Sequence, residues 1–285
     1  MRVADYALMA VMAVSFSSAA ILVVLSGAPG PVAATWRLII SSAIVAILAW
    51  ARGSISSLLK LSRRDLMIAL AGGLFLAMHF DLWMTSLRYI SVAVSVTLVD
   101  SYPAVLIVVG LAFFKEKYRP LEVLGSAIAM VGVALLSLSD PGDSFAIGVL
   151  LSLGGMAAMV LYLSVGKSMR TRLDTFSYVT AIYAPAAAFS AAASLALGYN
   201  LLYYSVKTWL CFLGLALVPM MGGHTVMNYL IGRRNFIAST IAMMAEPVGS
   251  AVLAYLILGQ SILFIQYVYM AVTLAGIGLA VVPQG

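Results

Sequence analysis

The sequence is poor in charge and almost lacks cysteine. Only 9% of its 285 residues are charged and 64% are hydrophobic, whereas soluble domains carry roughly 25% charged residues. The mean hydropathy is +1.09, so most of the surface faces hydrocarbon rather than water. The single cysteine, Cys211, excludes an intrachain disulfide and a thiolate cluster for zinc or iron–sulfur. These shortages exclude an ordinary soluble protein and predict a polytopic membrane protein.

The motifs of several protein classes are also missing. No H-E-x-x-H, G-x-S-x-G or D-D-x-x-D cluster occurs, which leaves an intramembrane enzyme as a remote alternative. The sequence has no P-loop, which argues against an ATP-driven pump, and no filter-like loop, which argues against an ion channel. The net charge of +6 comes from basic residues between apolar runs, where they act as topology signals. We therefore expect no nucleic-acid partner, no cofactor and no metal site.

What the sequence does contain is a series of long apolar runs. Each can cross about 30 Å of hydrocarbon at a rise of about 1.5 Å per residue, which predicts an all-α membrane protein. Ten transmembrane helices are predicted, at 3–26, 32–51, 66–87, 92–114, 120–139, 145–166, 175–198, 208–231, 236–258 and 262–282. The first run is longer than a signal-peptide core, so we interpret it as a mature span.

Lysine and arginine lie almost entirely on one side of these spans. Thirteen of the 16 fall at the N-terminus or in even-numbered loops, and only Arg88 and Lys207 fall in odd-numbered loops. Basic loops stay on the cytoplasmic side. Both termini are therefore predicted to be cytoplasmic, in a plasma membrane of prokaryotic type.

The two halves of the chain resemble each other at a shift of 144–145 residues. His79 corresponds to His224, and Pro103 corresponds to Pro247. Because each half holds an odd number of spans, the second half enters the membrane from the opposite side. The predicted domains are a first five-helix repeat (1–139) and a second, inverted five-helix repeat (145–285), which form one membrane unit. Many secondary transporters have this layout and bind substrate near the midplane.

Two segments carry a resemblance to a known family. They read TLVDSYPAVLIVVGLAFFKEKYRPLEVLGSAIAMVGVALL at 97–136 and AMMAEPVGSAVLAYLILGQSILFIQYVYMAVTLAGIGLAVV at 242–282. Each resembles the signature of the EamA-type transporters of the drug/metabolite transporter superfamily, in which a short turn links a proline-containing helix to a glycine-rich one. Gln260 stands where the family usually has the glutamate of the turn. The resemblance implies a transporter of amino acids, drugs or other small metabolites.

An ionisable side chain inside a span costs at least about 2.5–3.5 kcal/mol, so each one requires a reason. Glu246 lies at the centre of the ninth span, beside Pro247, with no cation within two helical turns. We interpret Glu246 as the centre of a substrate site. There it changes its protonation or its partner during the transport cycle.

The other candidate substrate residues come from the helices expected to surround this acid. Helical spacing places polar or small side chains on one face of helices 3, 4, 8 and 9, and helices 1 and 6 complete the cavity. The predicted substrate-binding residues are Glu246, His79, His224, Asn228, Trp83, Asp100, Tyr162 and Met243. For His79, His224 and Asn228, bridging between helices is the alternative role.

Arg37 lies deep in the second span and requires an acidic partner at a similar depth. Asp81 is the predicted partner in a structural charge pair, and Asp100 competes for the same guanidinium. We therefore expect Arg37 to serve the fold rather than the cargo.

Helices 5 and 10 carry small residues, including Gly125, Gly132 and Gly276, without a deep charge. Such faces allow close helix packing, either within the subunit or between the two subunits of a homodimer.

Together these features predict a secondary active transporter that alternates access around a central cavity in the lipid bilayer. The expected cargo is a small polar or zwitterionic metabolite such as an amino acid, the expected direction is export, and protons are the candidate coupling ion. The alternatives are a proton-independent exchanger or uniporter, and an importer of a cationic or neutral metabolite.

Overall fold

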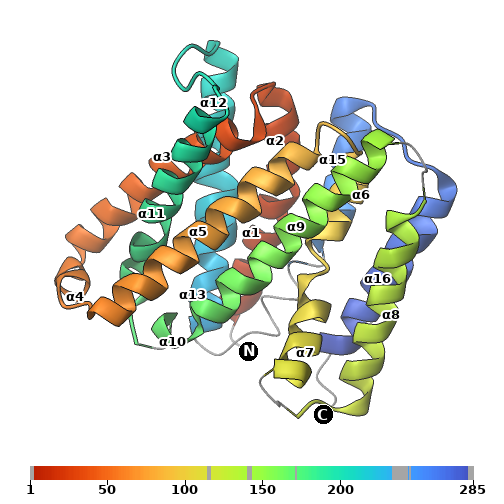
Figure 1. Ribbon diagram of the computed structural model, residues 1–285, viewed down its shortest axis with the longest axis horizontal. Coiled ribbons are helices and arrows are strands. Elements are labelled where there is room, and N and C mark those ends of the chain that lie inside the picture. The colour runs from red at the N-terminus through yellow and green to blue at the C-terminus, as the bar shows by residue number, and fades with distance from the viewer. Residues whose placement is uncertain are drawn as a thin grey trace.

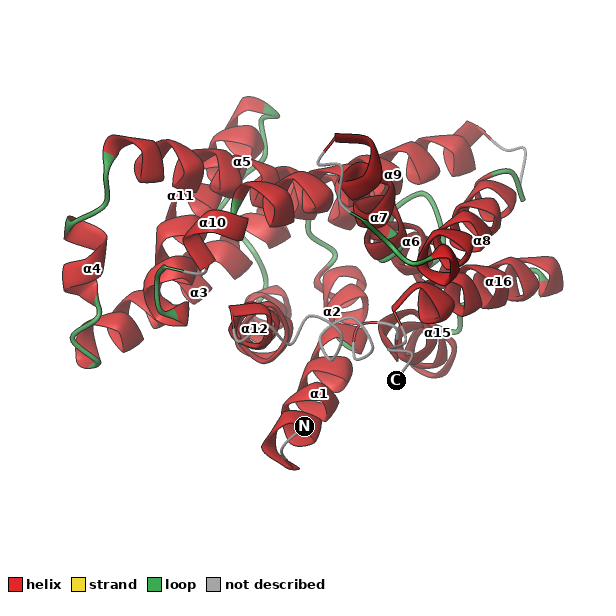
Figure 2. Ribbon diagram, turned by 90° about the horizontal axis from the view of Figure 1, so that it is seen from below, coloured by secondary structure: helices red, strands yellow, loops and turns green. Residues whose placement is uncertain are grey.

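The computed structural model describes residues 3–113, 117–139, 143–170, 172–232, 243 and 245–281. All regular elements in these residues are helical (Figures 1 and 2). The first repeat contains α1 (Val3–Ser17), α2 (Ala19–Ser26), α3 (Gly30–Ala51), α4 (Ile55–Leu59), α5 (Arg63–Ser86), α6 (Val92–Val99), α7 (Tyr102–Phe113) and α8 (Pro120–Ser137). The second contains α9 (Asp143–Val165), α10 (Lys167–Arg170), α11 (Thr175–Ala196), α12 (Val206–Leu215), the π-helix η1 (Ala216–Thr225), α13 (Val226–Gly232), α15 (Ala245–Leu258) and α16 (Phe264–Val281).

Apolar helices of spanning length make up most of this chain. Within the described residues, eight helical stretches are long and apolar enough to cross a membrane, and α15 and α16 are two shorter apolar helices. The predicted start of the ninth span, 236–242, lies outside the described residues. These ten helical stretches confirm the predicted all-α fold of two five-helix repeats.

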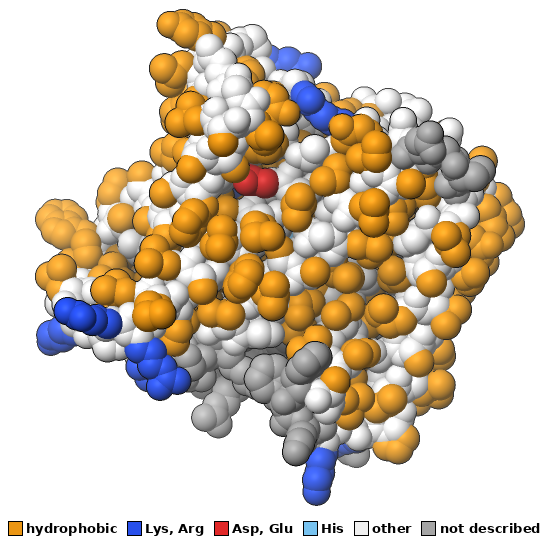
Figure 3. All heavy atoms as spheres, in the orientation of Figure 1, with side chains coloured by type: hydrophobic (Ala, Val, Ile, Leu, Met, Phe, Trp, Pro, Cys, Tyr) orange, Lys and Arg blue, Asp and Glu red, His pale blue; other side chains and the backbone are white. Residues whose placement is uncertain are grey.

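Large apolar side chains cover the outside of the bundle. Leu150 and Leu256 are each 70% exposed, which suits contact with lipid rather than water. Figure 3 shows apolar side chains over the middle of one face, with lysine and arginine only towards its two ends. This distribution is that of an integral membrane protein.

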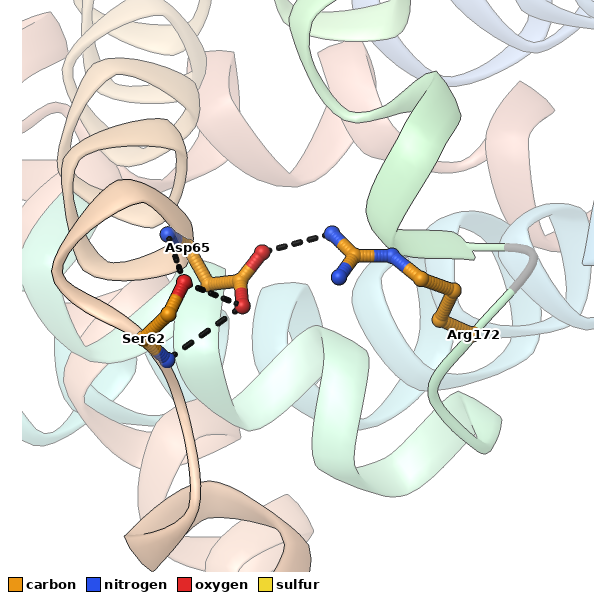
Figure 4. A network of polar contacts seen from close by, with 3 residues as sticks. All are labelled: Ser62, Asp65 and Arg172. Atoms are coloured by element: carbon orange, nitrogen blue, oxygen red, sulfur yellow. Dashed lines mark hydrogen bonds and ion pairs between the residues drawn. The ribbon is translucent and has the colours of Figure 1, made fainter.

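Both ends of the chain lie at the same end of the bundle, which we call the terminus end (Figure 1). Here α5 begins with a capping box. The Ser62 hydroxyl accepts a hydrogen bond from the Asp65 backbone N–H at 3.1 Å, and the Asp65 carboxylate accepts one from the Ser62 N–H at 3.3 Å. The other Asp65 oxygen accepts from Arg172, 2.5 Å away in the loop before α11 (Figure 4). This ion pair ties the first repeat to the second.

A second polar contact joins the repeats at the opposite end. Gln260, in the turn between α15 and α16, accepts a hydrogen bond from the Val92 backbone N–H at 3.0 Å. Val92 is the first residue of α6, where backbone N–H groups have no partner within the helix. The glutamine that departs from the family pattern therefore caps a helix of the other repeat.

Two spans of the first repeat are interrupted. Between α1 and α2, the hydroxyls of Ser17 and Ser18 donate to carbonyl oxygens one turn back, which competes with regular helix. Ser250 of α15 then donates to the Ser17 carbonyl at 3.1 Å. The other interruption falls at Asp100 and Ser101, just before Pro103, which lacks the N–H that would continue the helical hydrogen bonds.

The eighth span changes its helical form instead of breaking. α12 passes into η1, which contains Pro219, and then into α13. Single π-type turns inside α-helices occur frequently at functional sites. His224 lies in this stretch, and the Asn228 amide donates to its carbonyl oxygen at 2.9 Å.

Helices α8 and α16 pack backbone to backbone. A Cβ atom at Gly125 would lie 2.7 Å from the carbonyl oxygen of Gly276, and one at Gly276 would lie 2.8 Å from that of Gly125. The small faces predicted on helices 5 and 10 therefore contact each other within the subunit. A homodimer through these helices stays a prediction. It would have to use the outer surfaces of the two helices, because their small faces already contact each other.

Candidate functional site

A central cavity lies where α1, α2, α5, the interruption between α6 and α7, η1 and α15 meet. Its volume is about 20 Å³, which is room for about one water molecule. The lining residues are Phe16, Ala19, Arg37, His79, Trp83, Val99, Asp100, Tyr102, Met159, His224, Met243 and Glu246. A larger solute enters only if these walls move apart.

Most of the predicted substrate residues meet at this cavity. Its wall contains Glu246, His79, His224, Trp83, Asp100 and Met243 from the predicted set. Tyr162 and Asn228 are buried nearby but do not line it. Helices of both repeats therefore converge on one polar centre.

Two acids form the most unusual contact in the cavity. Asp100 lies at the interruption before α7, and Glu246 lies in the first turn of α15. Both line the same cavity, close enough to act on each other electrostatically. Two neighbouring carboxylates repel each other when both are ionised, which favours one proton on the pair. The pair can release that proton when another cation takes its place.

Arg37 lines the same cavity without an acidic partner in contact. Its guanidinium is fully buried, lies 4.2 Å from the centroid of the Phe80 ring and has no hydrogen bond from any of its three nitrogens. Asp81 instead accepts a hydrogen bond from Ser190 of α11 at 2.5 Å. The structure thus does not bring Arg37 and Asp81 together, because Asp81 faces α11 while Arg37 faces the cavity. Glu246, in the wall of the same cavity, is an acid whose charge acts on Arg37.

The two histidines occupy neighbouring positions in the wall, with ring centroids 6.1 Å apart. His79 Nδ1 hydrogen-bonds the carbonyl oxygen of Gly155 at 3.0 Å, which bridges α5 and α9. His224 packs edge-on against Phe16 and Phe80, with centroids 5.0 Å away in both cases. Its Nδ1 has no partner. His79 therefore combines a bridging contact with a place in the wall, whereas His224 keeps a ring nitrogen free.

Unpaired polar atoms cluster at this site. Among the described residues, six buried side-chain nitrogen and oxygen atoms have no hydrogen-bond partner. Three belong to Arg37 and one each to Trp83, Asp100 and His224, all of which line the cavity. Native proteins pair nearly all of their buried polar groups. A cluster of unpaired donors and acceptors around one cavity therefore indicates a ligand site.

Tyr162 and Asn228 lie next to the cavity, towards the terminus end. The Tyr162 hydroxyl donates to the side-chain amide oxygen of Asn228 at 3.2 Å and accepts from the side-chain N–H of Asn228 at 3.0 Å. Tyr162 lies one turn beyond Met159, and Asn228 lies one turn beyond His224. Asn228 also lines a second pocket nearer to the terminus end. This hydrogen-bonded pair therefore lies between residues of the central cavity and the second pocket.

Sequence reasoning missed several lining residues. Tyr102 lies beyond the helix interruption, so regular helical spacing from Asp100 does not predict its direction. Its hydroxyl donates to the Met243 sulfur at 2.6 Å. Phe16 and Ala19 flank the other interruption and carry no polar signal. Arg37 was identifiable by its depth, but a guanidinium packed on an aromatic ring has no signature in sequence.

Two repeats of apolar helices around a closed polar cavity are the architecture of a membrane carrier. The chain matches the family described as the EamA-like transporter family twice, over residues 3–138 and 146–282. The protein belongs to this family, which confirms the resemblance seen in the two signature segments.

A solved structure described only as "Crystal structure of protein" has the same fold. The alignment covers 98% of each chain, with a TM-score of 0.73 and 18% sequence identity. A search among curated proteins found no match.

Proposed function

We propose that this protein is a secondary active transporter that exports a small zwitterionic metabolite, such as an amino acid, in exchange for protons. The proposal depends mainly on one observation. The unpaired polar atoms of the described interior surround a single cavity whose wall holds both a buried guanidinium and two acids, Asp100 and Glu246.

The two sides of the cavity complement the two ends of a zwitterion. Arg37 and the Trp83 indole N–H offer donors to a carboxylate. Asp100 and Glu246 offer acceptors to an ammonium group. A buried polar site of this kind disfavours solutes that leave one of these groups unpaired.

Coupling to protons follows from competition at the acid pair. Without cargo, mutual repulsion favours a single proton on the Asp100 and Glu246 pair, even with Arg37 in the same cavity wall. An ammonium group at the same place stabilises both carboxylates in their ionised form and expels the proton. Solute and proton therefore bind alternately, and an inward proton gradient drives the solute outward.

Access alternates, in this proposal, by movement of the repeats at either end of the cavity. The Tyr162–Asn228 pair is the barrier on the terminus end. The bias of Lys and Arg favours a cytoplasmic location for this end. Cargo then enters the cavity past this pair and leaves at the opposite end.

Glu246→Gln tests the proposal. Glutamine keeps the shape of the side chain and cannot exchange a proton. The labelled amino acid that most stabilises the parent protein in a thermal-shift screen is offered to proteoliposomes. We expect Glu246→Gln to retain exchange of that amino acid across the membrane. The amount that it accumulates under a pH gradient should fall at least tenfold relative to the parent.

Asp81→Asn is the matched control, because Asp81 is also an acid within a span but hydrogen-bonds Ser190 away from the cavity. This variant should accumulate the amino acid like the parent. Undiminished gradient-driven accumulation by Glu246→Gln would reduce Glu246 to a helix-packing acid. The alternative exchanger or uniporter function would then be favoured.

A further inference from the structure

A second pocket of about 370 Å³ lies at the terminus end, beyond the Tyr162–Asn228 pair. It is formed by the turn after α3, by α10, by the start of α11 and by α13. Asn228 belongs to its wall, and His224, one turn away on the same span, belongs to the wall of the central cavity. The pocket is about eighteen times larger than that cavity in this conformation.

Two guanidinium groups line this pocket, and no described carboxylate forms an ion pair with either of them. Arg170 is only 8% exposed, and it donates one hydrogen bond to the Leu163 carbonyl oxygen and a long one, 3.5 Å, to the Tyr178 hydroxyl. Arg52 stacks on the Phe176 ring, 4.4 Å from its centroid. A buried cation without a counter-charge is unfavourable, so Arg170 favours a bound anion, and the exposed Arg52 adds a second positive charge to the same pocket wall.

The one acid in the pocket wall, Asp174, offsets only one of the two positive charges. Asp174 is the N-cap of α11, and its carboxylate accepts hydrogen bonds from the backbone N–H groups of Phe176 and Ser177, at 3.1 and 3.2 Å. The Ser177 hydroxyl donates to the same carboxylate. The nearby acid Asp65 is already paired with Arg172. The pocket therefore keeps a net positive charge.

We propose that this pocket binds the carboxylate or phosphate group of an amphiphilic anion. Guanidinium groups bind such groups through paired, charge-assisted hydrogen bonds. Leu173, Phe176 and Tyr178 provide an apolar and aromatic wall for the remainder of the ligand. Either a soluble organic anion or the headgroup of an anionic lipid carries this chemistry. Binding of the anion to this pocket does not depend on the proposed function. Only the further role, in which a soluble anion binds here before it reaches the central cavity, rests on that function.

The test uses the purified full-length protein in detergent, with phenyl phosphate as the probe and titration calorimetry in dilute buffer. We expect the parent to bind phenyl phosphate and not the cation benzylamine. The dissociation constant should rise at least tenfold in the double variant Arg52→Gln/Arg170→Gln. Arg64→Gln, which removes an exposed arginine at the same end but outside the pocket, should bind like the parent.

Where Arg170→Gln does not fold, Arg52→Glu reverses a charge at an exposed position and should weaken binding by a similar factor. Nanodiscs distinguish the two sources of anion. Competition by phosphatidylglycerol but not phosphatidylcholine identifies a lipid site, and undiminished binding in both identifies a site for soluble anions. Equal affinity of parent and arginine variants, or equal affinity for benzylamine, would overturn the proposal. Because no gradient or transport is involved, either result is independent of the experiment on Glu246.

Discussion

The positive charge of Arg37 is buried, and its guanidinium packs on the Phe80 ring rather than against a carboxylate. A cation over an aromatic face gains about 0.5–2 kcal/mol, which offsets only part of the cost of burying a guanidinium. The rest of that cost is recovered if Arg37 binds the cargo. The geometry therefore favours a role in binding over the structural role expected from its depth alone.

Arg37→Met separates these two roles. Methionine fills a similar volume among apolar neighbours, and replacing a buried charge by an apolar residue is often neutral or stabilising. We expect the variant to fold with an unchanged yield and thermal midpoint. The affinity for the cargo should fall at least tenfold, or about 1.4 kcal/mol, in the thermal-shift titration. Loss of the folded protein with this substitution would restore the structural interpretation, with Asp81 or Asp100 as the partner in another conformation.

The prediction of cavity residues succeeded where depth and helical face were enough. Glu246 and Asp100 are acids deep in spans whose polar faces are easily recognised, and both line the cavity. Tyr162 and Asn228 lie on the expected faces but bond to each other. Spacing along a helix shows which side chains share a face, but not the level at which two helices meet.

At the scale of elements, the spans were predictable because each is a long apolar run, and the span ends that lie in the described residues agree within a few residues. The interruption at Asp100 and the π-helix at Ala216–Thr225 were not predictable from the apolar pattern. Both contain or precede a proline, yet a proline inside a span also occurs in α11 at Pro185 without ending the helix. Neighbouring helices decide which of these prolines deforms the backbone, and a single sequence does not describe those neighbours.

The contact between α8 and α16 gives a prediction at this scale. A methyl group at Gly276 would lie 2.8 Å from the Cα atom of Ala129, and backbone atoms cannot move aside like a side chain. We expect Gly276→Ala to destabilise the protein by about 1–3 kcal/mol through overpacking, measured as a lower midpoint of thermal unfolding in detergent.

Gly214→Ala is the control for this substitution. Its new methyl group would lie 3.4 Å from the Leu22 methyl groups, an ordinary contact. Alanine also favours helix over glycine by about 0.8–1 kcal/mol, so this variant should be neutral or more stable. If both variants behave alike, the α8–α16 contact is looser than its backbone spacing indicates.

For the whole molecule, the orientation in the membrane is a prediction that labelling can check. Ser144, at the start of α9, and Ser56, in α4, are both exposed and lie at opposite ends of the bundle. In a Cys211→Ala background, Ser144→Cys should react with an impermeant maleimide added to intact cells. Ser56→Cys should react only after lysis. The reverse pattern would place the termini outside and contradict the inference from basic residues.

The ion pair between Asp65 and Arg172 has a consequence for the resting balance of the two access states. In the proposed transport cycle it joins the repeats while the terminus end is closed, and the Arg172 side chain is 56% exposed. Such a pair contributes about 0–1 kcal/mol, so it shifts the ratio of closed to open molecules by up to about fivefold. Mobile ions screen it, since the Debye length falls from about 10 Å at 0.1 M to about 3 Å at 1 M. We therefore expect the ionic strength on that side of the membrane to influence how often an idle molecule presents its cavity there, before any cargo or proton has bound.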